Sequence, residues 1–320
     1  MPAPASRSAR SIALEVLDRF DPKRDYAAPI LERLLERTDQ KQRATDLVLG
    51  TIRNRLAIDA VIAHFSGRPT NRIDRRLLNL IRIGAYELIY SPETPDYSIV
   101  NEAVNGARRA VGPKRAGFVN AVLREIIRHI ANRDVALADS ASRQTLVRTP
   151  TAGCEFDADI LPESPAEHLS MCFSLPVWLV SEWIDQFGPE TTRQICLASS
   201  RRPGLYIRAN SLKTTGSQLL ERLQQDEGRA NDYSPLPSAG EDCVCEMIRI
   251  AGPQAVTALP GFAEGLFTVQ DVSAARAAVV LAPQAGTTIL DLCAAPGTPD
   301  PRDPPPADAP QLHTRAPRLG

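Results

Sequence analysis

The sequence lacks the long apolar segments and clustered metal ligands that mark several classes of protein. No run approaches the ~18 consecutive apolar residues of a membrane helix, and the first residues contain no apolar core of a signal peptide. The six cysteines form no Cys-x-x-Cys pair and the four histidines are scattered, which argues against a zinc site. We therefore expect no membrane and no metal, and a cytoplasmic protein with reduced thiols.

Aromatic residues are also scarce, at 5%, whereas apolar residues make up 43% and charged residues 23% of the chain. This composition is ordinary for a soluble globular protein and excludes a collagen-like, coiled-coil or wholly disordered chain. The length of 320 residues predicts two or three domains. Their cores must be built mainly from Leu, Ile, Val and Ala.

The net charge of −1 hides an asymmetry between the two parts of the chain. Residues 1–130 contain 22 basic against 15 acidic residues, whereas the remainder contains 15 against 23. Nearly all of the basic residues in the first part are arginines, since only Lys23, Lys41 and Lys114 are lysines. An Arg-rich, positively charged segment favours a polyanionic partner such as RNA.

Apolar spacing divides the chain into segments of different character. Residues 1–130 show helical periodicity, as in the stripe of Ile73, Leu77, Leu80, Ile81 and Leu88, and show no strand-like alternation, which predicts an all-helical bundle. Residues 131–165 lose this periodicity and are polar, so we interpret them as a linker.

The second part of the chain has a mixed pattern. Residues 166–283 contain strand-like runs at 204–209, 244–250 and 266–270 between helical segments, which predicts a small α+β domain. Trp178 and Trp183 are expected in its core. Residues 284–297 contain a β-branched and apolar run followed by a small-residue loop, typical of a buried parallel strand and a nucleotide-type binding turn. Residues 298–320 contain seven prolines and predict a disordered tail.

In four places, and in the right order, the chain resembles the bacterial 16S rRNA cytosine-5 methyltransferases of the Sun/Fmu type. DLVLGTIRNR at 46–55 and FVNAVLR at 118–124 resemble helices of that family's NusB-like domain. PVWLVSEW at 176–183 and RPGLYIRAN at 202–210 resemble the entry to its middle domain. The most specific match is LPGFAEGLFTVQDVSA at 259–274 followed by ILDLCAAPG at 289–297, which resembles the approach to S-adenosylmethionine motif I.

The resemblance implies a multi-domain fold: an all-α NusB-like bundle, a small α+β domain and the first strand and loop of a Rossmann-like methyltransferase domain. It implies S-adenosylmethionine as cofactor and 16S rRNA as partner. The implied reaction forms 5-methylcytosine after a cysteine thiolate adds to carbon 6 of a base that has left its stack. The cofactor-binding residues that it implies are Asp291, Cys293, Ala294, Ala295, Pro296 and Gly297.

The sequence departs from the family pattern directly after motif I. Thr298 and Pro299 replace the expected continuation, and Pro299 has no backbone N–H to offer a ligand. The family's nucleophilic cysteines lie in later motifs, and no cysteine follows Cys293, so we assign no catalytic residue. We expect a truncated or frame-shifted member that is inactive alone. The alternative is a NusB-like RNA-binding protein without catalysis, linked to transcription antitermination.

The residues expected to contact RNA are basic or amide side chains in both parts of the chain. Their alternative interpretation is an ordinary solvated surface that needs no ligand. Asp271 is expected either to line the cofactor pocket or to cap the following helix. The RNA-binding candidates are Arg72, Arg75, Arg76, Arg108, Arg109, Lys114, Arg115, Arg208 and Asn210.

Overall fold

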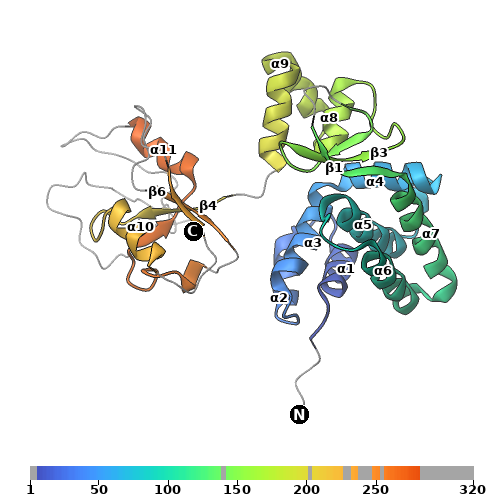
Figure 1. Ribbon diagram of the computed structural model, residues 1–320, viewed down its shortest axis with the longest axis horizontal. Helices are drawn as coiled ribbons and strands as arrows, with labels where there is room; N and C mark the ends of the chain where they lie inside the picture. Colours follow the sequence, from blue (N-terminus) through green and yellow to red (C-terminus); the bar gives the residue numbers. More distant parts are fainter. Residues whose placement is uncertain are drawn as a thin grey trace, which may run out of the picture. The chain divides into compact units, whose positions relative to one another are not determined.

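The computed structural model describes residues 6–137, 142–200, 204–225, 232–236, 247–252 and 256–281. They fall into two units, Met1–Arg201 (unit 1) and Arg202–Gly320 (unit 2) (Figure 1). The predicted start of a Rossmann-like domain at 284–297 and the predicted tail at 298–320 lie outside the described residues.

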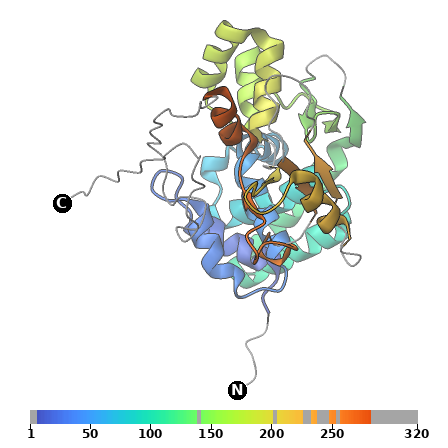
Figure 2. The same cartoon turned by 90° about the vertical axis from the view of Figure 1, so that its left-hand side faces the viewer.

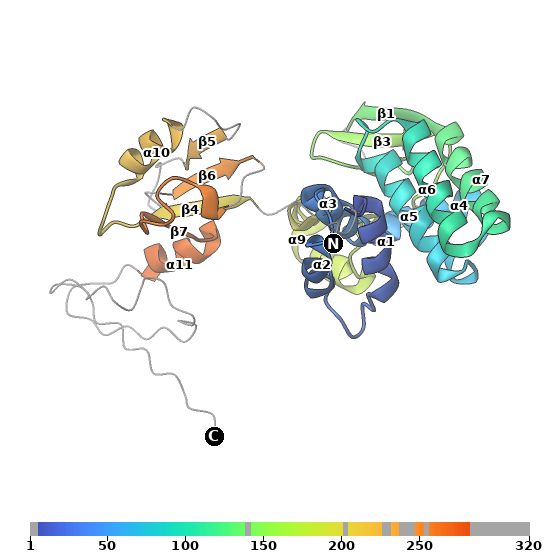
Figure 3. The same cartoon turned by 90° about the horizontal axis from the view of Figure 1, so that it is seen from below.

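Unit 1 begins with the helical bundle that the periodicity predicts. Its helices α5, α6 and α7 lie side by side (Figure 3). The helices are α1 (Ala9–Arg19), α2 (Ala27–Leu35), α3 (Lys41–Arg53), α4 (Arg55–Ser66), α5 (Arg75–Tyr90), α6 (Asp96–Val111) and α7 (Pro113–His129), with a 3-10 turn η1 (Thr70–Arg72) before α5.

Helix α5 forms the centre of the bundle and is buried on nearly all sides. The carboxylate of Asp74 accepts hydrogen bonds from the backbone N–H groups of Arg76 and Leu77, which caps its first turn. Gly84 allows α7 to approach closely, because a Cβ at this position would lie 2.9 Å from the Leu123 side chain. Apolar burial around the whole helix is typical of a central core element.

The segment predicted to be a linker instead contains a three-stranded antiparallel sheet in the order β1-β3-β2. Its strands are β1 (Ile130–Ala136), β2 (Thr145–Val147) and β3 (Ala152–Phe156). Leu146 pairs with Cys154, and both side chains are buried together with Phe156 and Leu161. The linker interpretation is wrong because short, irregular strands are specified by pairing and burial more than by local periodicity.

Helices α8 (Pro165–Phe173) and α9 (Val177–Ser200) complete unit 1, with a kink at Gly188. They lie side by side in Figure 2, and α8 packs directly on α4 of the bundle. Their buried residues belong to the same apolar cluster as the bundle. Trp183 is partly buried and packs against this cluster, and not in the core of the α+β domain where it was expected. Trp178 is 71% exposed, since it lies two positions from buried Val180 and so on the opposite helix face.

Unit 2 is a small α+β fold around a four-stranded antiparallel sheet in the order β5-β6-β4-β7. The strands predicted at 204–209, 244–250 and 266–270 are present, and β5 is an addition. The predicted start of this domain at residue 166 is wrong, because the buried residues of α8 and α9 pack in the core of unit 1. Its core contains Ile207, Leu219, Ile248 and Phe267. The elements are β4 (Leu205–Ala209), α10 (Gly216–Gln224), β5 (Asp232–Pro235), β6 (Met247–Ala251), η2 (Val256–Ala258), β7 (Phe267–Val269) and α11 (Val272–Leu281).

Candidate nucleic-acid interface

Two of the predicted arginines at the start of α5 hold neighbouring helices together. Arg75 Nη2 donates to the backbone oxygen of Phe20 at 2.8 Å, just after the end of α1. Arg76 Nε lies 3.1 Å from the carboxylate of Asp18 on α1. Arg72 is exposed in η1. Arg75 and Arg76 thus have partners within unit 1, whereas the side chain of Arg72 has none among the described residues.

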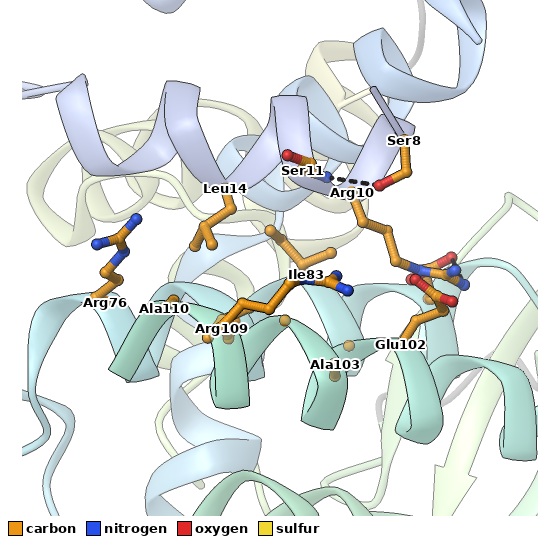
Figure 4. Close-up of a pocket in the computed structure, with 14 residues that line it drawn as sticks. Ser8, Arg10, Ser11, Leu14, Arg76, Ile83, Glu102, Ala103, Arg109 and Ala110 are labelled. Atoms are coloured by element: carbon orange, nitrogen blue, oxygen red, sulfur yellow. Dashed lines mark hydrogen bonds and ion pairs between the residues drawn. The ribbon is translucent and has the colours of Figure 1, made fainter. Parts of the chain in front are cut away.

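Arg76 and Arg109 line a cavity of about 180 Å³ between α1, α5 and α6 (Figure 4). The carboxylate of Glu87 lies in its wall and is almost completely buried. Arg10 donates two hydrogen bonds to it, at 2.6 and 2.8 Å, and Arg43 donates one at 2.9 Å. This cavity therefore contains an internal ion-pair cluster whose central charge is already neutralised.

A larger groove of about 590 Å³ runs between α6 and α7. Its floor is apolar, and its edges carry arginine and amide side chains from both helices. It contains Arg108 from the predicted set, but not the other RNA-binding candidates. The lining residues are Asp96, Tyr97, Val100, Asn101, Val104, Arg108, Asn120, Arg124, Ile127 and Arg128.

Among the described residues, two arginines of this groove lack the carboxylate partners that Arg10 and Arg76 of the cavity have. Arg124 donates to the amide oxygen of Asn120 at 3.0 Å, and Arg108 makes a 3.5 Å contact with the amide oxygen of Asn105. Within the described part of the chain, neither pairs with a carboxylate. Amide partners leave the positive charge of a guanidinium available to an anion.

Sequence reasoning missed Arg124 and Arg128 as binding candidates. Together with Asn120 they recur at four-residue spacing along α7, which places all three on one helix face. This four-residue spacing was the sequence signal that could have identified Arg124 and Arg128 as binding candidates. The groove also contains Tyr97 at the start of α6, whose side chain is 79% exposed.

The other predicted RNA-binding residues are not among those that line this groove. Lys114 and Arg115 are exposed in the first turn of α7, beyond Gly112, whose φ of 89° makes the turn after α6. Arg208 is half-buried in β4 of unit 2. Asn210 has a structural use, since its Nδ2 donates to the Gly265 oxygen at 3.1 Å and its Oδ1 accepts from the Leu212 N–H at 3.1 Å.

Of the residues predicted to line the cofactor pocket or its approach, the structure describes Asp271 but not the loop at 291–297. Asp291, Cys293, Ala294, Ala295, Pro296 and Gly297 lie outside the described residues. Asp271 acts as a helix cap, because its carboxylate accepts from the backbone N–H of Ser273 at 2.8 Å at the start of α11. Over the residues that the structure describes, no helix could span a membrane and no group of His, Cys, Asp or Glu could hold a metal ion.

Three thiols in unit 1 are buried and unpaired. Burial raises the pKa of the Cys154 thiol to about 12 and those of Cys172 and Cys196 to about 11. A nucleophilic cysteine needs a thiolate near neutral pH, so these three side chains are suited to core packing and not to covalent catalysis.

Two segments of the chain match known protein families. Residues 7–128 match the NusB family, and residues 175–240 match the ferredoxin-like domain of RsmF/B-like methyltransferases. The crystal structure of PH0851 superposes with a TM-score of 0.55 and 19% identity, over 92% of this chain and 60% of that one, which supports the fold.

The curated relatives are ribosomal RNA methyltransferases. The probable ribosomal RNA small subunit methyltransferase B of Bacillus subtilis is 31% identical over 91% of this chain and 58% of its own length. The ribosomal RNA small subunit methyltransferase B of Escherichia coli O1:K1 is 30% identical over 91% of this chain and 59% of its own length. The chain thus spans somewhat under three fifths of these relatives. The resemblance predicted from the sequence is confirmed: the chain is similar to these methyltransferases, and its match to the NusB family is followed by its match to the ferredoxin-like domain of RsmF/B-like methyltransferases.

Proposed function

We propose that the protein belongs to an S-adenosylmethionine-dependent system that forms 5-methylcytosine in 16S rRNA, and that unit 1 binds the RNA. The names of the relatives support the methyltransferase assignment. The groove between α6 and α7 supports the RNA-binding role, since three arginines line it and two of them pair only with amides. Guanidinium groups in this state are suited to phosphate.

Salt-dependent RNA binding tests this role. The affinity of the protein for a labelled 16S rRNA transcript should fall linearly as salt rises on a double logarithmic plot. The double variant Arg108→Gln/Arg124→Gln should reduce the slope by roughly 1.5, because each lost phosphate contact contributes about 0.7 to 0.9.

The double variant Arg33→Gln/Arg37→Gln is the matched control, since it removes the same charge from exposed positions in and just after α2. Its salt slope should equal that of the unmodified protein. Equal slopes for both double variants would show that RNA does not use this groove. Absence of salt-dependent RNA binding would overturn the proposed function.

The thiolate that adds to carbon 6 of the cytosine is proposed to come from none of Cys154, Cys172 and Cys196, because burial keeps these thiols protonated. S-Adenosylmethionine would supply the methyl group. The residues predicted to hold this cofactor lie outside the described part of the chain.

A second candidate function is RNA binding without catalysis. It is favoured by the position of the groove, which lies entirely within the residues matched to the NusB family. RNA binding by this groove would then need no methyltransferase machinery. A methyl-transfer assay separates the two candidates: incorporation of a labelled methyl group into 16S rRNA would exclude the binding-only function, whereas retained RNA binding without incorporation would support it.

A further inference from the structure

We propose that the groove between α6 and α7 holds a short single-stranded RNA segment and stacks one unpaired base on Tyr97. This inference rests on the proposed RNA-binding function and adds the class of RNA and the residue that recognises it. Neither the family matches nor the names of the relatives assign a role to Tyr97.

Tyr97 is placed as a stacking platform. Its side chain is 79% exposed in the first turn of α6, directly after Pro95 and Asp96. A large aromatic side chain that contributes so little to the core presents a free ring face to solvent. Aromatic rings beside basic side chains are the usual platform for unpaired bases.

The shape and polarity of the groove suit a nucleotide. Its volume of about 590 Å³ lies within the range of small-ligand sites. Val100, Val104 and Ile127 provide an apolar floor, against which the flat face of a base can lie. Asn101 and Asn120 add amide groups that can bond to a base edge.

The order of side chains along the groove suits an RNA strand. Because α6 and α7 run antiparallel from their turn at Gly112, Tyr97 and Arg128 lie toward one end and Arg108 toward the other. Eleven residues of α6 separate Tyr97 from Arg108, a rise of about 16 Å. A strand whose base stacks on Tyr97 can therefore pass its next phosphates along Arg124 to Arg108.

The charge of the groove favours an anion over a cationic or neutral occupant. Asp96 is an acidic lining residue, and its carboxylate is paired with Arg133 at 2.6 Å. Arg128 is paired with Glu125 at 2.6 Å, whereas Arg108 and Arg124 have amide partners. The groove therefore keeps uncompensated positive charge next to an exposed aromatic ring.

A single strand fits these features better than a duplex. In a duplex the base faces are covered by their neighbours, so Tyr97 would find no face on which to stack. A duplex could use only the arginines, through its phosphates. The preference for a single strand therefore depends on Tyr97, and a variant that removes the ring should lose this preference.

Binding of matched RNA oligonucleotides tests this inference. The protein is titrated with a labelled 12-nucleotide single strand and with the same strand in a duplex, at one salt concentration. Tyr97→Ala should weaken single-strand binding about tenfold and leave duplex binding unchanged. Tyr97→Trp should retain the affinity, and its indole fluorescence should change when the single strand is added.

Tyr26→Ala is the matched control, because Tyr26 is 85% exposed and lies outside the groove. It should bind both RNAs as the unmodified protein does. Thermal unfolding monitored by circular dichroism should be the same for all of these variants, since the two tyrosines are exposed.

The outcomes separate this inference from the proposed function. If Tyr97→Ala binds the single strand normally while Arg108→Gln/Arg124→Gln loses salt-dependent binding, the groove binds RNA but the stacking inference is wrong. Equal affinity for single strand and duplex would also overturn it. If the unmodified protein binds neither RNA, the RNA-binding function itself fails, and a protein partner becomes the occupant to examine.

Discussion

The cavity between α1, α5 and α6 and the groove between α6 and α7 share a helix, and both are lined by arginines. At the cavity, Arg10 and Arg43 both donate to the buried carboxylate of Glu87, so each of these two arginines has a carboxylate partner inside the protein. In the groove, Arg108 and Arg124 pair with amides and keep their charge. Arginine therefore stabilises the fold on one side of α6 and is available for a ligand on the other. The partner of each arginine decides its role.

The largest expected effect is on the stability of the cavity cluster. Glu87→Gln should lower the free energy of unfolding by about 3 kcal/mol, because it leaves Arg10 and Arg43 without their shared carboxylate. Chemical denaturation monitored by circular dichroism measures this change. Glu102→Gln is the control, since Glu102 lines the same cavity without an ion pair among the described residues. An equal loss in both variants would contradict the assignment.

Single substitutions of Arg82 and Arg124 compare an arginine that is paired with a carboxylate with an arginine of the groove. Arg82 donates two hydrogen bonds of 2.7 Å to Asp59, and both side chains are largely buried. Arg82→Gln should therefore cost about 2 kcal/mol of stability. Arg124→Gln should change stability by less than about 0.5 kcal/mol, because Arg124 is exposed. The same denaturation experiment compares them, and a large loss for Arg124→Gln would make the groove arginines structural.

The smallest expected effect is a pH dependence at the end of α7. The pKa of His129 is raised above its usual 6.5, chiefly by the hydrogen bond from its Nδ1 to Asp157 at 2.8 Å and further by Glu125. The folded state thus favours the imidazolium. Its contribution to stability is full below about pH 6.5 and is lost as pH rises through the raised pKa.

His129→Gln should remove this contribution. The difference in melting temperature between the variant and the unmodified protein should therefore be larger at about pH 5.5 than at about pH 8.5. Asp157→Asn should reproduce part of the effect, since it removes the main hydrogen-bond partner of the histidine. A difference that does not vary with pH would contradict the assignment.

The sequence was sufficient for the helices but not for the roles of individual arginines. Helical periodicity located the bundle because α5 buries residues such as Ile81 and Leu88 at regular intervals. The roles of Arg75 and Arg76 depend on Phe20 and Asp18, which come from another helix. No local pattern reports such a partner, so the sequence could not show that Arg75 and Arg76 already bond to groups within the protein.

The three-stranded sheet was missed for a related reason. The alternation in Ala152–Phe156 is short, and the strands pair with irregular register between β1 and β3. Their stability comes from pairing and from burial of Leu146 and Phe156 against the helices. Proline and polar residues in the same segment concealed this contribution.

The shared apolar core determines how the molecule can be divided. The side chain of Ser174, between α8 and α9, accepts a hydrogen bond from the backbone N–H of Leu56 at 3.0 Å, so residues 118 positions apart are joined. A fragment ending at residue 130 would leave the apolar surface of the bundle uncovered where Phe156 and Leu169 now pack. Exchange of NusB-type modules between relatives should therefore carry the segment through Ser200 with the helices.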